Sequence, residues 1–253
     1  MLWGQLIRGD KMASISGRGL SAERRFYCGM AIAMIVLTLI GFAPSFYFIG
    51  VVHYPRPNPT LTPLVVAHGV LFSAWMLLFA AQAGLIAANR RDLHRRLGVA
   101  GFLLAVLLVP MIYLAAVGQV ARANQMPFSD PLNWTAVPLF LLPAFIILIW
   151  QGWKYRRDPA AHKRLMLGAA LVVVQPAIGR LPIAPPVLSG FAFLNFLAWA
   201  MFVPLILWDQ RSLGRLHWAT KLGARLYAVC IVVTLVALAT GFWGPIAAHL
   251  PGV

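Results

Sequence analysis

The chain has 253 residues, of which 61% are hydrophobic and only 11% are charged, and its mean hydropathy is +0.80. A soluble domain carries about 25% charged residues, so this composition excludes an ordinary soluble protein. The formal net charge of +15 would indicate nucleic acid if the chain were soluble. Because the basic residues lie at the ends of apolar blocks, they indicate membrane topology and contact with anionic lipids, with no nucleic-acid partner.

The apolar residues form blocks of roughly twenty, the length that crosses ~30 Å of hydrocarbon. We therefore predict an all-α, polytopic bundle with seven transmembrane helices. The predicted spans cover residues 28–50, 64–88, 97–121, 134–153, 158–183, 191–208 and 226–248. Cys28 and Cys230 both fall within spans and are expected to be reduced, so no disulfide is predicted.

Residues 1–21 mix Gly, Ser and scattered basic residues, which predicts a flexible basic segment, with Met12 as an alternative start. Residues 22–253 are predicted to form a single seven-helix transmembrane domain. A Glu-Arg-Arg flank before the first span resembles the start of a signal peptide, but the apolar block is too long for one and no A-x-A site follows. We therefore expect an uncleaved helix.

Proline marks several boundaries of the predicted spans. Pro110 lies inside the third span and predicts a kink. Asp158 and Pro159 combine an N-cap with a proline at the first helical position, so they predict the start of the fifth span. Pro182 is expected to end that span.

Lys and Arg are distributed unevenly between the two sets of span ends. Arg56, Arg122 and Arg180 lie at one set, and the other eighteen of the 21 basic residues lie at the opposite set. Since cytoplasmic loops carry the excess of Lys and Arg, we predict a cytoplasmic N-terminus and an exterior C-terminus. The alternation holds at every loop, which supports the count of seven.

Three of the predicted cytoplasmic turns are alike. They cover residues 90–98, 156–165 and 215–223, each combines basic residues with a histidine, and each leads into an odd-numbered span. This pattern indicates helical hairpins repeated in parallel after a lone first helix. Convergence is the alternative, because a basic turn can arise independently.

Five polar or aromatic residues recur along the second span at steps of four and three. They are His68, Phe72, Trp75, Phe79 and Gln82. This spacing puts them on one face of a helix, and a polar stripe exposed to lipid would be costly. We predict that the face is buried in the bundle and that the Gln82 amide bonds to another helix.

Several short motifs follow one another between about residues 64 and 225. They are Ala67-His68-Gly69, Leu93-His94-Arg95-Arg96-Leu97-Gly98, His162-Lys163-Arg164-Leu165-Met166, Arg180-Leu181-Pro182 and Gly214-Arg215-Leu216-His217-Trp218-Ala219-Thr220. Together they resemble a widespread group of uncharacterised bacterial multi-pass membrane proteins with about seven spans. The resemblance implies a location in the bacterial inner membrane and no particular activity. Histidines at helix ends also give a layout similar to haem-binding and quinone-associated helical membrane proteins.

Two residues near the exterior ends of their spans are candidates for ligand binding. His68 is a candidate haem or metal ligand, or a hydrogen-bond donor to a quinone, and the alternative is a bond to a neighbouring helix or to interfacial water. Arg180 is a candidate for binding a haem propionate, a quinone carbonyl or a lipid phosphate. Its alternative is to extend into the membrane interface.

Together with Trp75 and Gln175, His68 and Arg180 form the predicted cofactor site for haem b or a quinone. We expect a pocket between the second and fifth spans that opens toward the exterior leaflet. Its walls are expected to be Phe72, Trp75, Gln175 and Gly179, which are aromatic or small enough to admit a flat ring.

His94, His162 and His217 lie in the three similar turns. Three neutral imidazoles that converge can hold zinc or iron, so these histidines are a candidate metal site. Alternatively, they cap the turns and touch lipid headgroups, because the surrounding guanidinium groups disfavour a cation.

Common catalytic signatures are absent from the sequence, including Walker, G-x-G-x-x-G, C-x-x-C, H-E-x-x-H and G-x-S-x-G motifs. The predicted spans also lack Asp and Glu away from their borders, which argues against a proton-coupled transporter. Two main hypotheses follow. The protein is a redox-associated membrane component that binds haem b or quinone, or it is a non-enzymatic accessory subunit of a larger membrane complex. A small-molecule or lipid-binding membrane protein is a third possibility.

Overall fold

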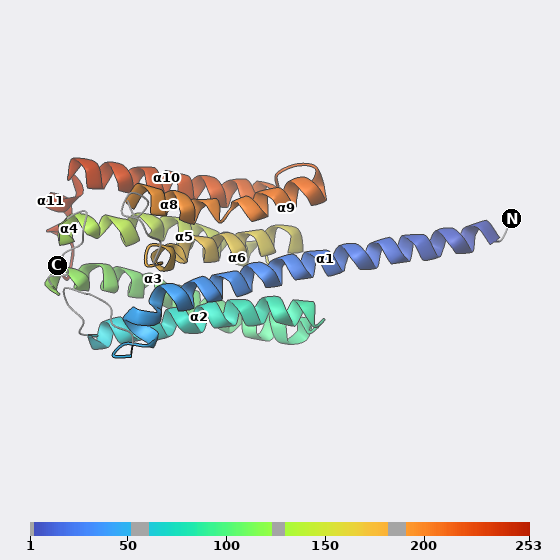
Figure 1. The fold of residues 1–253 in the computed structure, drawn as a ribbon, viewed down its shortest axis with the longest axis horizontal. Helices are drawn as coiled ribbons and strands as arrows, with labels where there is room; N and C mark the ends of the chain where they lie inside the picture. The colour runs from blue at the N-terminus through green and yellow to red at the C-terminus, as the bar shows by residue number, and fades with distance from the viewer. Residues whose placement is uncertain (1–2, 52–60, 123–129, 182–190) are drawn as a thin grey trace.

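The structure is a computed structural model that describes residues 3–51, 61–122, 130–181 and 191–253, with side chains from Ala22 onward except that of Phe191. Within these ranges the regular structure is entirely helical (Figure 1). The elements are α1 (Trp3–Phe42), η1 (Ala43–Tyr47), α2 (Pro63–Ala87), α3 (Arg91–Ala121), α4 (Pro131–Trp134), α5 (Ala136–Lys154), α6 (Pro159–Val173), α7 (Gln175–Ile178), α8 (Phe191–Ala200), α9 (Val203–Leu213), α10 (Trp218–Thr240) and α11 (Trp243–Ala247).

Six helical segments in the described residues are long and apolar enough to cross a membrane. They are Ala22–Tyr47, Pro63–Ala87, Arg91–Ala121, Pro131–Lys154, Ala192–Leu213 and Trp218–Thr240. The prediction of an all-α, multi-pass architecture is therefore confirmed. Three of the six combine two elements: α1 with η1, α4 with α5, and α8 with α9.

The segment predicted as the fifth span is not among these six. Asp158 caps α6 as predicted, since its carboxylate accepts hydrogen bonds from the backbone N–H groups of Ala160 and Ala161. However, α6 has only 15 residues, so it is about 22 Å long. Pro176 has no N–H with which to continue the helical hydrogen bonds, and the chain passes into the four-residue α7. Pro182 lies outside the described residues.

The last membrane helix also differs from its predicted bounds. It was expected over residues 226–248, but α10 covers Trp218–Thr240 and α11 is a separate short helix. The start is set by His217, whose Nδ1 accepts a hydrogen bond from the Ala219 N–H at 3.2 Å. The end is set by Gly241, which has a left-handed φ of 69°. Lys221 and Arg225 therefore lie within the helix, where the sequence alone had suggested a loop.

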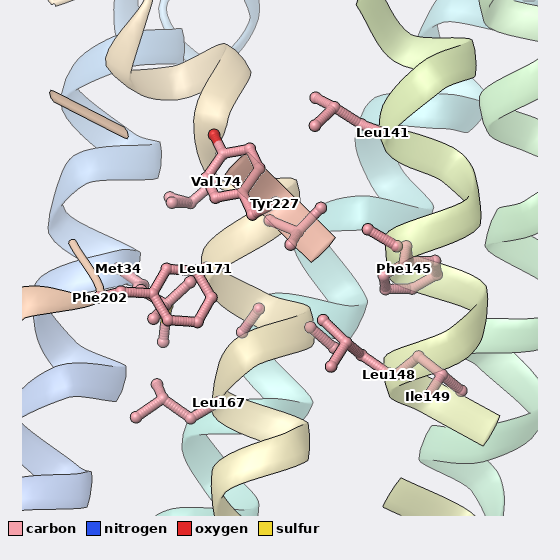
Figure 2. Close-up of a cluster of buried hydrophobic side chains, with 14 of the residues drawn as sticks. Met34, Leu141, Phe145, Leu148, Ile149, Leu167, Leu171, Val174, Phe202 and Tyr227 are labelled. Atoms are coloured by element: carbon pink, nitrogen blue, oxygen red, sulfur yellow. The ribbon is translucent and has the colours of Figure 1, made fainter. Parts of the chain in front are cut away.

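The centre of the bundle is α6, because nine of its fifteen residues are buried. In α2, by contrast, only Trp75 and Met76 are buried. Figure 2 shows Leu148 of α5 pointing toward α6. Small residues allow this close packing of helices, since a Cβ added to Gly168 would lie 3.7 Å from both Leu148 and Phe202.

The two ends of the bundle are chemically different. The turns after α2, α5 and α9 gather at one end, here called the basic end (Figure 1). Arg24 reaches this end by donating to the Ala87 carbonyl at 3.4 Å, and Lys163 pairs there with Glu23. At the other end, here called the opposite end, the Tyr113 hydroxyl donates to the Pro251 carbonyl at 2.9 Å.

The N-terminal part of α1 extends beyond the basic end, whereas α6 and α7 finish short of the opposite end (Figure 1). The helix α1 begins at Trp3 and so runs through most of the segment 1–21, whose flexibility stays a prediction. The early end of α6 leaves the opposite half of the bundle without a central helix.

Candidate ligand-binding cavity

The stripe predicted on the second span faces the bundle. Trp75 is only 2% exposed, and its ring makes an edge-to-face contact with Phe145 of α5 at 5.5 Å between centroids. On the other side of α2, Val70 and Leu77 are 54% and 59% exposed. The helix therefore places its aromatic face against α5 and its aliphatic face outward.

Gln82 makes the predicted bond to another helix. In the amide orientation that satisfies its neighbours, the Gln82 side-chain NH₂ donates to His94 Nδ1 at 2.5 Å. Its oxygen accepts from the Gly98 N–H at 2.9 Å. Gln82 thus joins the end of α2 to the first turns of α3.

A cavity of about 810 Å³ lies in the opposite half of the bundle. Its lining comes from the end of α1 with η1, the start of α2, the end of α3, α4 with the start of α5, the junction of α6 with α7, and α8. Ligand pockets measure about 300–1,000 Å³, so the cavity is large enough for a ring-sized ligand. Part of its wall is η1, a short π-helix, and such helices are frequent at functional sites.

Most of the residues predicted for the cofactor site and its walls line this cavity. They are His68, Phe72, Gln175, Gly179 and Arg180. Trp75 is the exception, because its ring is packed against Phe145, although the next residue, Met76, does line the cavity. The structure therefore brings α2 and the junction of α6 with α7 together around one space, and Trp75 packs behind its wall.

Several polar groups of the lining are satisfied by one another. The Tyr47 hydroxyl and Ser73 Oγ are 2.7 Å apart, and Ser73 Oγ donates to the Gly69 carbonyl at 2.7 Å. Gln175 Nε2 donates to Asn195 Oδ1 at 3.3 Å, and both of these side chains are buried. These bonds join η1 to α2 and α7 to α8, so they hold the walls together.

Three other buried atoms of the lining have no hydrogen-bond partner within the described residues. They are Ser45 Oγ, His68 Nδ1 and Gln119 Oε1. Gln119 Nε2 donates to the Pro131 carbonyl at 3.1 Å, so only the oxygen of this amide is left without a partner. Buried polar atoms are rarely left unpaired, so these three atoms indicate a place for a polar ligand group or for water.

Two arginines give the lining a positive charge. Arg180 donates to the Pro176 carbonyl at 2.8 Å, and its guanidinium lies 4.7 Å from the centre of the Phe42 ring. Arg122, at the end of α3, also lines the cavity. An oxygen-rich or anionic ligand group would be attracted to this side of the cavity.

No family model, curated protein or solved structure matches this chain.

Sequence reasoning did not assign Ser45, Gln119 or Arg122 to the site. Ser45 follows Pro44 at the end of the first span, and a proline at a helix end was the available signal for a distorted backbone. The sequence places all three residues near the predicted exterior ends of spans one and three, but it did not predict that they meet in one cavity.

The three candidate metal-binding histidines are not gathered into a metal site. The rings of His94 and His162 are 6.2 Å apart, and His162 Nδ1 is 2.8 Å from the Gly152 carbonyl. His217 is used as the N-cap of α10. Across the part of the chain that the structure describes, no three His, Cys, Asp or Glu side chains lie close enough to hold a metal ion.

Electrostatics at the basic end agree with a capping role for His217. Burial, together with the Arg164 guanidinium, holds the pKa of His217 below its ordinary value. The imidazole is therefore kept neutral, which leaves Nδ1 free to accept the Ala219 N–H.

A buried ion pair that the sequence did not predict joins three helices at the basic end. Arg164 Nη2 of α6 lies 2.6 Å from Asp209 Oδ1 of α9, and both side chains are at most 2% exposed. The second carboxylate oxygen accepts from Thr220 Oγ1 at 2.6 Å and from the His217 N–H at 3.0 Å. Both polar ends of this pair are therefore bonded within the protein.

Proposed function

We propose that this protein binds a quinone-type ring in the cavity as a redox-associated component of the bacterial inner membrane. The observation that supports this proposal is the cavity itself. It combines His68 of α2 with Arg180 after α7, and its wall contains buried polar atoms without a partner in the described residues. Phe42, Phe72 and Phe145 supply aromatic surface for a flat ring. A guanidinium and an imidazole supply groups that recognise ring oxygens.

Haem b is the other ring expected from the sequence, and the lining favours it less. His68 is the one histidine that lines the cavity within the described residues, so these residues do not form a bis-histidine pair. A quinone requires only hydrogen bonds and an apolar enclosure. No specific feature of the described surface favours the alternative of an accessory subunit.

The proposal includes a topology of seven passes with a cytoplasmic N-terminus. Six long apolar helices support most of these passes, and α6 with α7 would complete the seventh within the protein interior, where its length need not match the bilayer. The basic end would then face the cytoplasm and its anionic lipids. The cavity would lie in the exterior half of the membrane, accessible to a lipid-soluble ligand.

The test is quinone binding to the purified protein in detergent. A para-benzoquinone with a short alkyl tail should bind in a one-to-one calorimetric titration, and Arg180→Leu should weaken binding by about 10- to 100-fold, because a hydrogen bond to a charged group contributes about 1.5–3 kcal/mol. Arg225→Leu makes the same change at an exposed site on α10 and should leave the affinity unchanged.

A visible absorption spectrum of the same preparation distinguishes the two rings. Absence of quinone binding would contradict the proposal, and an intense absorption band from bound porphyrin would assign the cavity to haem.

A further inference from the structure

Among the buried polar atoms of the cavity that have no partner in the described residues, one has a hydrogen-bonding role fixed by its chemistry. Gln119 donates its NH₂ group to the Pro131 carbonyl at 3.1 Å, which leaves Oε1 as an acceptor. An amide oxygen has no proton, so this atom can only accept hydrogen bonds.

We infer that the cavity binds its ring preferentially in the reduced, hydroxyl-bearing form, a hydroquinone, rather than as the quinone. This inference rests on the proposed function, since it specifies which form of the ligand the same cavity selects. A quinone presents carbonyl oxygens, which accept and never donate, so it cannot pair with Gln119 Oε1. A hydroquinone has two O–H donors and can pair with this atom.

The arginines do not reverse this preference. Arg122 and Arg180 are donors, and the oxygens of both ligand forms have lone pairs that accept from a guanidinium. These residues therefore contribute to affinity for either form without discriminating between them. The Ser45 hydroxyl can donate or accept, and His68 Nδ1 can do either according to the tautomer of the imidazole, so neither residue discriminates between the two forms. Discrimination is left to Gln119 Oε1.

The cost of the mismatch sets the expected size of the preference. Leaving a buried acceptor unpaired forfeits a hydrogen bond and retains its desolvation penalty. For one such acceptor we expect the hydroquinone to bind roughly tenfold more tightly than the quinone. A site built to bond a hydroxyl also rejects analogues that lack it.

The experiment compares three ligands on the purified full-length protein under anaerobic conditions. They are a short-chain para-benzoquinone, its hydroquinone, and the dimethyl ether of that hydroquinone, which retains the ring but has no O–H donor. The hydroquinone should bind roughly tenfold more tightly than the other two. Equal binding of quinone and hydroquinone, or tighter binding of the quinone, would overturn the inference and leave the proposed function intact. Failure of all three ligands to bind would overturn both.

Matched variants assign the preference to this acceptor. Gln119→Leu should reduce the ratio of hydroquinone to quinone affinity, while the quinone itself still binds. Gln151→Leu is the control, because Gln151 Oε1 is also buried without a partner in the described residues but does not line the cavity. The ratio should be unchanged in this control. A full preference in Gln119→Leu would overturn the role given to Gln119 Oε1.

Discussion

At the scale of single residues, the pair of Arg164 and Asp209 is the most constrained polar feature of the described bundle. Moving two charges out of water is expensive, and the cost is recovered only when their polar atoms are bonded. Asp209 has partners on both carboxylate oxygens, and Arg164 Nη1 additionally donates to the Ala160 carbonyl at 2.8 Å. The pair thus holds the start of α6, the end of α9 and the start of α10 in one arrangement.

Breaking this pair should destabilise the protein strongly. Asp209→Leu leaves the Arg164 charge buried without its partner, and we expect a loss of about 3–5 kcal/mol in the free energy of unfolding. The double variant Arg164→Met with Asp209→Leu should recover most of the loss, because no charge then remains buried. Unfolding in mixed detergent micelles measures both values.

The control for that experiment is an ion pair of the same type on the surface. Arg90 and Asp92 are 3.3 Å apart, but their side chains are 55% and 58% exposed. Asp92→Leu should leave the unfolding transition essentially unchanged, because water solvates the released arginine. If both substitutions of aspartate had similar effects, burial would not be the reason for the stability of the inner pair.

At the scale of elements, the contact between α1 and α7 sets one wall of the cavity. Gly41 lies against the backbone of Ala177, and a Cβ added to Gly41 would overlap the Ala177 carbonyl. The neighbouring Phe42 and Ala177 itself both line the cavity. The absence of a side chain at residue 41 therefore allows α1 to close this wall.

Gly41→Ala should separate α1 from α7. Backbone cannot yield as a flexible side chain would, so we expect a loss of about 1–3 kcal/mol in stability and weaker quinone binding. Gly29→Ala, on the same helix, is the control, since nothing lies within 4 Å of the added Cβ. That variant should be neutral or slightly stabilising. Thermal unfolding with and without quinone measures both effects, and equal behaviour of the two variants would contradict the close contact.

At the scale of the whole molecule, the number of membrane passes depends on whether α6 together with α7 crosses the membrane. With seven passes, the two ends of the chain lie on different sides of the membrane, and with six they lie on the same side. The basic end gathers the turns after α2, α5 and α9 (Figure 1). The C-terminal residues pack at the opposite end, where Trp243 Nε1 donates to Thr135 Oγ1 at 2.8 Å.

Topology reporters test the proposed arrangement directly. A reporter placed after Asn89 should be cytoplasmic, and one placed after Val253 should be exterior, because Lys and Arg favour the cytoplasmic side of short loops. A fusion after Leu213, beyond α9, should agree with the one after Asn89. Detection of both the Asn89 and Val253 reporters on the same side would contradict seven passes.

The all-α bundle was predictable from the sequence because the membrane acts on local composition. Every backbone polar group in hydrocarbon must bond within its own segment, so a block of about twenty apolar residues has to be a helix. The inward face of α2 was predictable for the same reason, since Gln82 could not be exposed to lipid without cost. The Lys and Arg residues likewise predicted that three turns lie at the same end of the bundle.

The sequence did not predict which side chains pair with one another when they are far apart in the chain. Arg164 and Asp209 are 45 positions apart, and each resembles an ordinary charge at a span border until α6 is placed in the centre of the bundle. The cavity also depends on tertiary structure, because it exists where α6 ends early and eight other elements contribute to its lining.

The amino-acid sequence by itself thus determined the helices, their inward faces and their uneven charge, since these properties depend on residues within one or two helical turns. Only the tertiary structure decided that Trp75 supports the cavity without lining it, and that Ser45 and Gln119 reach the same space as His68. Which side chains meet across different helices depends on how those helices pack against one another. That packing is a property of the whole bundle and of no single segment.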